Sequence, residues 1–242
     1  MKTETLNYDA DVPMVGTLFR PDGAEAAPAI LVFSDIMGIG DHSRERAARL
    51  AERGYVAFAA DLHGNGQILP AEQALEQLER FYANPDVTCG RGEAALAQLQ
   101  GVPGVDATRI AAMGFCYGGT LSFEMARRGA PLSASIGFHA GLATSNPNGG
   151  ASIKGKVLAC IGSEDPAVPP EQRAAFEAEM RAAGVDWQLH LYGGVYHSFT
   201  DWRCDAAGLP EFARYNAAAD QRSWAAMCGL LDEVFDREAG EG

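Results

Sequence analysis

The alternation of short apolar runs with longer helical patterns is the feature that most constrains how this chain can fold. The apolar runs are bounded by Gly, Asp or Pro, as is typical of strands, and lie at residues 14–19, 29–35, 55–61, 109–115, 134–139, 156–163 and 187–194. Helical patterns follow at residues 42–54, 71–84, 92–101, 118–129, 169–184 and 210–235. A strand followed by a helix, repeated along the chain, predicts an α/β fold with a mostly parallel sheet and helices on both faces.

Size and composition favour a single domain over residues 1–242. Of the 242 residues 47% are hydrophobic, and there is no repeat or Ser/Gly-rich linker. The formal net charge of -13 and the lack of a Lys/Arg cluster argue against nucleic acid as a partner. The N-terminus lacks the apolar region of a signal peptide, and no apolar run is long enough to span a bilayer. We therefore expect a soluble, cytoplasmic protein with no membrane partner.

The cysteines do not suggest a metal site or a disulfide framework. They are odd in number and lack CxxC or Cys/His spacing, at Cys89, Cys116, Cys160, Cys204 and Cys228. In a reducing cytosol we expect free thiols and no bound zinc.

One of these thiols, Cys116, lies between glycines where a predicted strand meets a predicted helix. The run Gly114-Phe115-Cys116-Tyr117-Gly118 follows the nucleophile-elbow pattern G-x-C-x-G, with cysteine where serine is usual. Glycines are needed because the turn is sharp, and side chains two residues from the nucleophile would collide with the strand and the helix. The start of a helix also favours the thiolate, which is the form that attacks. The alternative is an inert thiol buried in a glycine-rich turn.

A nucleophile on this fold needs an acid and then a histidine later in the chain, each after a strand. Asp165 and His197 fulfil both conditions, because each closely follows a predicted strand and they occur in that order. Glu164 is adjacent to Asp165 and could be mistaken for the acid. His139 also ends a strand and competes with His197, but it precedes Asp165 and so breaks the expected order. Asp165 could instead cap a turn, and His197 could be a loop histidine.

Four segments together resemble the dienelactone hydrolase family of the α/β-hydrolase fold: GFCYGG around Cys116, GSEDPAVP around Asp165, GGVYHSF around His197, and FSDIMGIGDH after the strand at 29–35. The resemblance implies a carboxymethylenebutenolidase-like hydrolase of lactones or activated carboxylic esters. Cys116 would be the nucleophile that forms an acyl-enzyme, His197 the base and later the acid, and Asp165 the residue that orients the imidazole. It also implies that no metal or organic cofactor takes part. The expected partner is a small-molecule lactone or ester, and we expect a monomer or a small homo-oligomer.

The elbow also predicts an oxyanion hole. One donor is the backbone N–H of Tyr117, which follows the nucleophile, and the other is an N–H from the loop after an early strand, at Ile36. Asp35 stands where the family usually has a glutamate that helps to form the thiolate. Because aspartate is one methylene shorter, that role would be weaker or would act through water.

A second departure from the family concerns the substrate. Family members that act on dienelactone carry an arginine four residues after the catalytic histidine, where this chain has Asp201. Arg203 lies two residues further on, and Arg80 resembles a second anion-binding arginine. An acid in a carboxylate site would repel the substrate, so a neutral lactone or a small ester is at least as good a candidate.

Two other functions stay open from the sequence. A thiol redox sensor would oxidise Cys116 and resolve it with a thiol such as Cys204, although CxxC is missing. A non-catalytic ligand-binding relative could also retain the fold. Among the other histidines, His63 could line the site or belong to a turn, whereas His190 and His42 are predicted to be structural.

Overall fold

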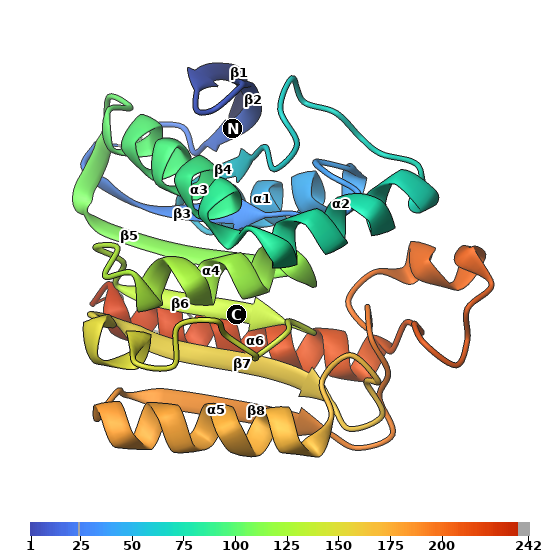
Figure 1. Cartoon of the computed structure of the whole chain (residues 1–242). Helices are drawn as coiled ribbons and strands as arrows, with labels where there is room; N and C mark the ends of the chain where they lie inside the picture. Colours follow the sequence, from blue (N-terminus) through green and yellow to red (C-terminus); the bar gives the residue numbers. More distant parts are fainter. Residues whose placement is uncertain (24, 237–242) are drawn as a thin grey trace.

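In the computed structural model, which describes residues 1–23 and 25–236, eight strands form one sheet (Figure 1). Their spatial order is β1-β2-β4-β3-β5-β6-β7-β8. The strands are β1 (Lys2–Asp9), β2 (Pro13–Arg20), β3 (Ala27–Phe33), β4 (Val56–Ala60), β5 (Val105–Phe115), β6 (Ala134–Phe138), β7 (Lys156–Gly162) and β8 (Trp187–Tyr192). β2 pairs antiparallel with both β1 and β4, whereas all neighbours from β4 to β8 are parallel. The mostly parallel α/β sheet predicted from the sequence is confirmed.

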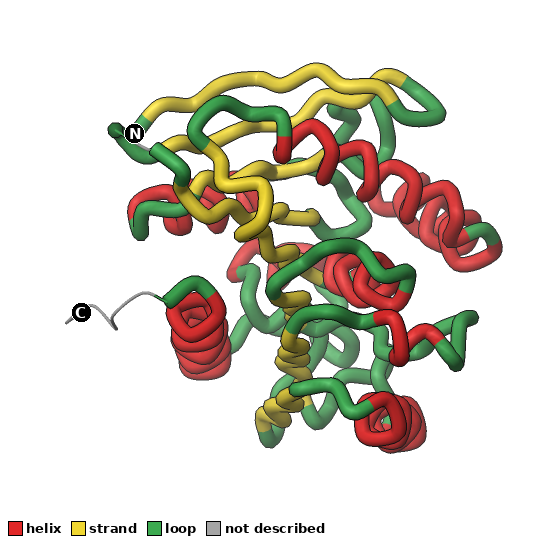
Figure 2. Tube along the Cα trace, turned by 90° about the vertical axis from the view of Figure 1, so that its left-hand side faces the viewer, coloured by secondary structure: helices red, strands yellow, loops and turns green. Residues whose placement is uncertain are grey.

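Helices cover both faces of the sheet, as the edge-on view of Figure 2 shows. On one face lie α1 (Asp41–Glu52) and α6 (Ala217–Val234). On the other lie α3 (Pro85–Gln100), α4 (Tyr117–Arg127) and α5 (Pro170–Ala183), with α2 (Ala71–Ala83) packed against α3. Two short 3-10 helices, η1 (Gly149–Ser152) and η2 (Trp202–Ala207), lie in loops.

The apolar run of β3 shows why the central strands have no polar side. Ile30 and Val32 belong to the core between the sheet and the α1/α6 layer, whereas Leu31 and Phe33 belong to the core on the α3/α4 side. All four are fully buried. Successive side chains of a strand point to opposite faces, so a strand between two helical layers must be apolar throughout. Each such side chain contributes roughly 1.5–3 kcal/mol by burial, which holds the end of the strand firmly in place.

The structure departs from the predicted elements in three places. β1 was not predicted, because it is an edge strand whose side chains are mostly exposed and polar. The helix predicted over 210–235 begins only at Ala217, where the side chain of Asn216 accepts a hydrogen bond from the backbone N–H of Ala219 at 3.0 Å. α3 begins at Pro85 instead of Gly92, since glycines in its first half hide the helical pattern.

The parallel strands bring the predicted site residues to one edge of the sheet. Asp35, Cys116, Asp165 and His197 follow β3, β5, β7 and β8, so all four lie beyond the carboxyl ends of strands. Among the described residues, no helix combines the length and the apolar character needed to cross a membrane.

Candidate active site

Cys116 occupies a strained turn between β5 and α4. Its φ of 52° and ψ of -122° lie outside the regions that a non-glycine residue normally adopts. The flanking glycines permit this turn: a Cβ on Gly114 would overlap the backbone of Gly118, and a Cβ on Gly118 would overlap the carbonyl oxygen of Ser34. Cys116 is partly exposed and directly precedes α4, as the elbow pattern predicts.

Asp165 and His197 form a buried pair beside this turn. The Oδ2 atom of Asp165 lies 2.8 Å from Nδ1 of His197, and both side chains are buried. The other carboxylate oxygen of Asp165 accepts a hydrogen bond from the backbone N–H of Ala167 at 2.9 Å, which fixes the orientation of the carboxylate. Glu164, the neighbouring carboxylate, instead accepts a hydrogen bond from Ser163 on the exposed surface. Nδ1 of His197 therefore carries a proton, and Nε2 is the atom that faces a reaction.

The electrostatics of His197 connect it to the thiol. Burial disfavours the charged imidazolium, but the negative charge of Cys116, the hydrogen bonds to Asp165 and Cys116, and the charge of Asp165 outweigh it and raise the pKa of His197 to about 10. The interaction with Cys116 among these causes shows that its side chain lies beside the imidazole of His197. The structure brings the three predicted residues together.

His139 supports the nucleophile turn and was not predicted to do so. Its Nδ1 accepts a hydrogen bond from the backbone N–H of Cys116 at 3.2 Å, and its Nε2 lies 2.9 Å from Oγ1 of Thr200. It is fully buried, has a φ of 41°, and packs edge-on against the ring of His197. Burial, followed by the charge of His197, lowers the pKa of His139 well below its usual range. His139 is therefore a neutral acceptor that shares the N–H of Cys116 with the carbonyl oxygen of Phe138, which lies 3.0 Å from that nitrogen.

The predicted oxyanion donors lie on either side of the elbow. Tyr117 is the first residue of α4, so its N–H lacks a partner within the helix. Ile36 packs in the same small apolar cluster as Tyr117 and Cys116. The loop of Ile36 is fastened by His63, whose Nε2 lies 2.8 Å from the Ile36 carbonyl oxygen. The sequence left open whether His63 lines the site or belongs to a turn. In the structure it contacts the loop that would supply the second oxyanion donor.

Comparison with known proteins fits this geometry. The family model described as "Dienelactone hydrolase family" matches residues 14–235. The chain belongs to the dienelactone hydrolase family. Among solved structures it is similar to m3DLH, with 42% identity, a TM-score of 0.92 and coverage of 96% of this chain and 98% of that one. It is also similar to P91, described as a dienelactone hydrolase-like promiscuous phosphotriesterase from metagenomic libraries, with 37% identity, a TM-score of 0.91 and the same coverage.

A further relative is similar over almost the whole chain. A protein of Bradyrhizobium sp., described as a probable 2-oxo-3-(5-oxofuran-2-ylidene)propanoate lactonase, is 29% identical over 245 residues, which cover 93% of each chain. A solved dienelactone hydrolase homologue from Klebsiella pneumoniae, only 19% identical at a TM-score of 0.79, shares the fold. The α/β-hydrolase fold inferred from the sequence is confirmed by these similarities.

Two acidic side chains, those of Asp35 and Asp201, lie near each other at the loop after β3. Asp35 is half-buried, and one of its oxygens accepts a hydrogen bond from the backbone N–H of Met37 at 2.8 Å. Burial raises the pKa of Asp35 to about 6, and the charge of Asp201 adds to that effect against the hydrogen bond and the charge of His197. Asp35 and Asp201, distant in the sequence, therefore share one electrostatic environment next to the candidate active site.

Of the two arginines proposed for anion binding, Arg203 is paired with an acidic residue and Arg80 is exposed. Arg203 in η2 pairs with Glu45 at 2.7 Å and lies 3.9 Å from Asp201. Arg80 lies on an exposed part of α2, where its nearest acidic partner is Glu76 at 4.0 Å. The structure keeps Arg203 near the β3 loop and leaves Arg80 in solvent.

Tyr82 lies close to the elbow, and sequence reasoning did not consider it. Its side chain is largely exposed, and desolvation of the phenol, followed by the charge of Cys116, raises its pKa. Its ring meets that of Tyr117 edge-on, with 5.3 Å between centroids. The only sequence signal was an aromatic residue near the end of a helical pattern, which packing explains equally well.

Proposed function

We propose that this protein hydrolyses lactones or activated carboxylic esters through a covalent acyl-enzyme on Cys116. The observation that carries the proposal is a partly exposed Cys116 on a positive-φ turn, beside a histidine whose Nδ1 lies 2.8 Å from the carboxylate of Asp165. A thiolate beside an imidazolium is a nucleophile already activated before substrate arrives. The family membership and the lactonase relative support the same reaction class.

The proposed reaction has two stages. The sulfur of Cys116 attacks the carbonyl carbon, and the N–H groups of Tyr117 and Ile36 stabilise the oxyanion that forms. As the C–O bond breaks, His197 gives its proton to the leaving alkoxide or enolate, which leaves a thioester. His197, now neutral, takes a proton from water, and the resulting hydroxide attacks the thioester and releases the acid and the thiolate. Asp165 keeps Nδ1 protonated in both stages.

The charges around the site favour an uncharged substrate. Asp201 and Asp35 lie near each other beside the candidate active site, and Arg203 is paired with Glu45. A carboxylate on the substrate would meet two acids and no free guanidinium in this part of the described chain. Neutral lactones and small esters are therefore the expected substrates.

A second reaction class is favoured by one comparison. P91, 37% identical over almost the whole chain, is described as a promiscuous phosphotriesterase. A neutral phosphotriester such as paraoxon has an electrophilic centre and a good leaving group, so the same thiolate and N–H donors suit attack at phosphorus. We infer a weaker phosphotriesterase activity at Cys116, because turnover there requires hydrolysis of a phosphorylated thiol.

The geometry disfavours a redox sensor. The candidate resolving thiol, Cys204, contacts the carbonyl oxygen of Ser198 and the carboxylate of Asp205. Burial, with the charges of Asp205 and Asp201, raises the pKa of Cys204 to about 12, so it stays a poorly reactive thiol. A non-catalytic binder would have no need for the strained elbow and its buried histidine–aspartate pair.

The test is hydrolysis of p-nitrophenyl acetate, cis-dienelactone and paraoxon by the wild type, Cys116→Ala and Cys204→Ala under reducing conditions. We expect Cys116→Ala to lose activity and Cys204→Ala to retain it, with a transient acyl adduct on Cys116 detected by mass spectrometry. Full activity in Cys116→Ala, or a wild type that turns over none of the three substrates, would refute the proposal.

A further inference from the structure

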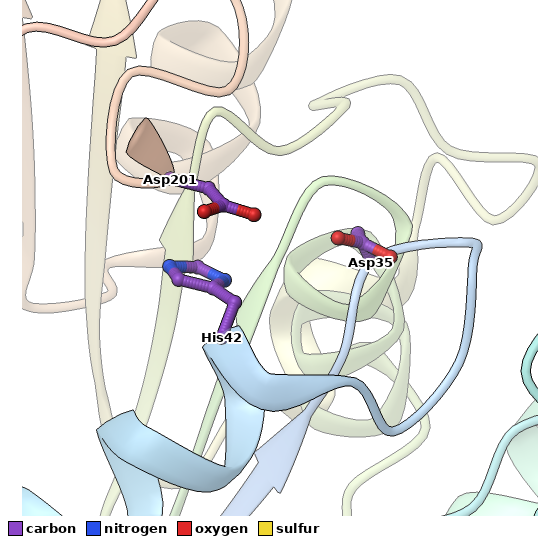
Figure 3. Close-up of side chains that lie close together, drawn as sticks. All are labelled: Asp35, His42 and Asp201. Carbon is purple, nitrogen blue, oxygen red and sulfur yellow. The ribbon is translucent and has the colours of Figure 1, made fainter. Parts of the chain in front are cut away.

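Thr200 lies at the centre of a buried group of polar side chains next to the nucleophile elbow. It belongs to the loop between β8 and η2, and only 1% of its surface is exposed. Its hydroxyl oxygen lies 2.9 Å from Nε2 of His139 and 3.3 Å from Nε2 of His42. His42 is in the first turn of α1, and Figure 3 shows its side chain facing Asp201, the residue that follows Thr200. A single hydroxyl therefore connects the histidine of the elbow with α1.

The hydrogen bonds of His139 determine which of its nitrogens carries the proton. Burial, followed by the charge of His197, lowers the pKa of His139, so its ring is neutral, with one N–H and one lone pair. The backbone N–H of Cys116 can only donate, and it lies 3.2 Å from Nδ1, so Nδ1 holds the lone pair. Nε2 therefore carries the proton and donates it to the hydroxyl oxygen of Thr200.

The hydroxyl proton of Thr200 then needs an acceptor of its own. Within residues 1–23 and 25–236, the only other hydrogen-bond partner of this hydroxyl is Nε2 of His42. Arg46 indicates the same polarity, because its Nε–H can only donate and lies 3.4 Å from that nitrogen. The carbonyl oxygen of Thr200 is also 3.2 Å from Nε2 of His42, but it accepts the shorter hydrogen bond, at 2.6 Å, from Nη2 of Arg46. Nε2 of His42 is thus an acceptor.

An ion pair holds the α1 end of this series of hydrogen bonds. Nη2 of Arg46 lies 2.8 Å from the carboxylate of Asp220 in α6, and both side chains are largely buried. Because Arg46 also binds the backbone of Thr200, the carbonyl group and the hydroxyl of this residue are both fixed. From Cys116 to His42 each donor has its own acceptor, so the protons have one consistent arrangement. Hydrogen bonds in such a series strengthen one another.

We infer that Thr200 is a positioning residue of the nucleophile, because its hydroxyl sets the tautomer of His139 that accepts from the Cys116 backbone. The φ of 52° at Cys116 persists only where its surroundings hold it. Without the hydroxyl, the buried Nε2–H of His139 would lack an acceptor, which favours the other tautomer. The Nδ1–H of that tautomer would oppose the N–H of Cys116 and displace the elbow. The inference rests on the proposed role of Cys116 as the nucleophile.

The experiment compares Thr200→Val, which keeps the shape and removes the hydroxyl, with Thr200→Ser, which retains it. Thr17→Val on β2 controls for the loss of another buried threonine hydroxyl. The tautomer of His139 is read from the imidazole ¹⁵N chemical shifts of the full chain labelled at histidine, and His139→Asn assigns the resonances. Alkylation of Cys116 by iodoacetamide is followed by mass spectrometry, and kcat and KM are measured with p-nitrophenyl acetate.

We expect the wild type, Thr17→Val and Thr200→Ser to carry the His139 proton on Nε2. In Thr200→Val the proton should move to Nδ1, and alkylation of Cys116 should slow. Its kcat should fall about tenfold or more, with a change in KM below about twofold, because a small displacement of a reacting group lowers the rate without removing substrate binding.

Three results would each overturn the inference: a wild-type His139 protonated on Nδ1, an unchanged tautomer in Thr200→Val, or a tautomer that moves while alkylation and kcat stay at wild-type values. Equal losses in Thr200→Ser and Thr200→Val would also refute it, because the hydroxyl is retained in one of them. Thermal melting checks folding; if Thr200→Val does not fold, Thr200→Ala takes its place. The tautomer and the alkylation rate do not depend on turnover, so a wild type without hydrolysis would refute the proposed function and leave this test intact.

Discussion

Replacement of Cys116 by serine should lower the pKa of His197 substantially. A tenfold change in a protonation equilibrium is worth about 1.4 kcal/mol, so a pKa raised from 6.5 to about 10 means that the site favours the imidazolium by roughly 5 kcal/mol more than water does. This preference exists although burial opposes it, and the charge of Cys116 is its largest favourable cause. A serine hydroxyl is neutral and cannot replace that charge. Because an opposite charge at close range shifts a pKa by about 1 to 3, we expect a fall of that size.

The titration can be followed by NMR of the imidazole rings in protein labelled at histidine. His197→Gln assigns the resonance, and Cys204→Ser controls for the loss of a thiol elsewhere. The sign of the pH dependence also follows: wild-type hydrolysis of an alkyl lactone should decline above about pH 10, where the imidazolium that protonates the leaving group is lost. In Cys116→Ser, activity should instead rise with pH as His197 becomes the neutral base. A pKa near 10 in Cys116→Ser would refute the ion-pair reasoning.

Three further predictions test the elbow, its support and the charge of the site. Gly118→Ala should destabilise the protein by about 1–3 kcal/mol in urea unfolding, because the new Cβ overlaps the carbonyl oxygen of Ser34. The control Gly229→Ala in α6, where the space is open, should be neutral or slightly stabilising. Equal unfolding midpoints for the two variants would contradict this prediction. His139→Leu should lower kcat with little change in KM. His139→Asn should recover part of the rate, because its side-chain oxygen can accept the same hydrogen bond and asparagine tolerates a positive φ. Equal rates in the two variants would show that the ring only fills space. Asp201→Asn should raise kcat/KM for cis-dienelactone about fivefold relative to p-nitrophenyl acetate, since removal of a nearby like charge is worth about 1 kcal/mol; an unchanged ratio would show that this carboxylate does not face the substrate.

The proximity of the three proposed catalytic residues could be predicted, because in a parallel sheet the position of a residue after a strand determines the edge at which it lies. Parallel strands end at one edge, so a nucleophile, an acid and a histidine that each follow a strand must lie near one another. Gly114 is required by the close approach of β5 to the first turn of α4, and Gly118 by the close approach of α4 to the end of β3, so both glycines mark the turn in the sequence. Each of these features depends on a short stretch of the chain and can therefore be recognised in a single sequence.

Contacts between loops could not be predicted in this way. His139 was disfavoured as the base because it precedes Asp165 in the chain. Nothing in the sequence indicated that its ring accepts a hydrogen bond from the backbone N–H of Cys116. Asp35, His42 and Asp201 meet only because the β3 loop, α1 and η2 converge, and nothing in the spacing of these residues indicates that. Tyr82, at the end of α2, meets Tyr117, at the start of α4, through a contact that depends on loop conformation.

The edge-on contact between the rings of His139 and His197 explains why only one of the two is protonated. Their ring centroids are 5.0 Å apart, so two imidazolium ions there would repel each other strongly. His197 has the carboxylate of Asp165 and the sulfur of Cys116 as partners, whereas His139 has a backbone N–H and a hydroxyl, which stabilise a neutral ring. The proton therefore stays on His197, the proposed acid of the reaction. A single protonated ring next to the sulfur is the state that the proposed attack requires, and the neutral neighbour holds the cysteine backbone without competing for the charge.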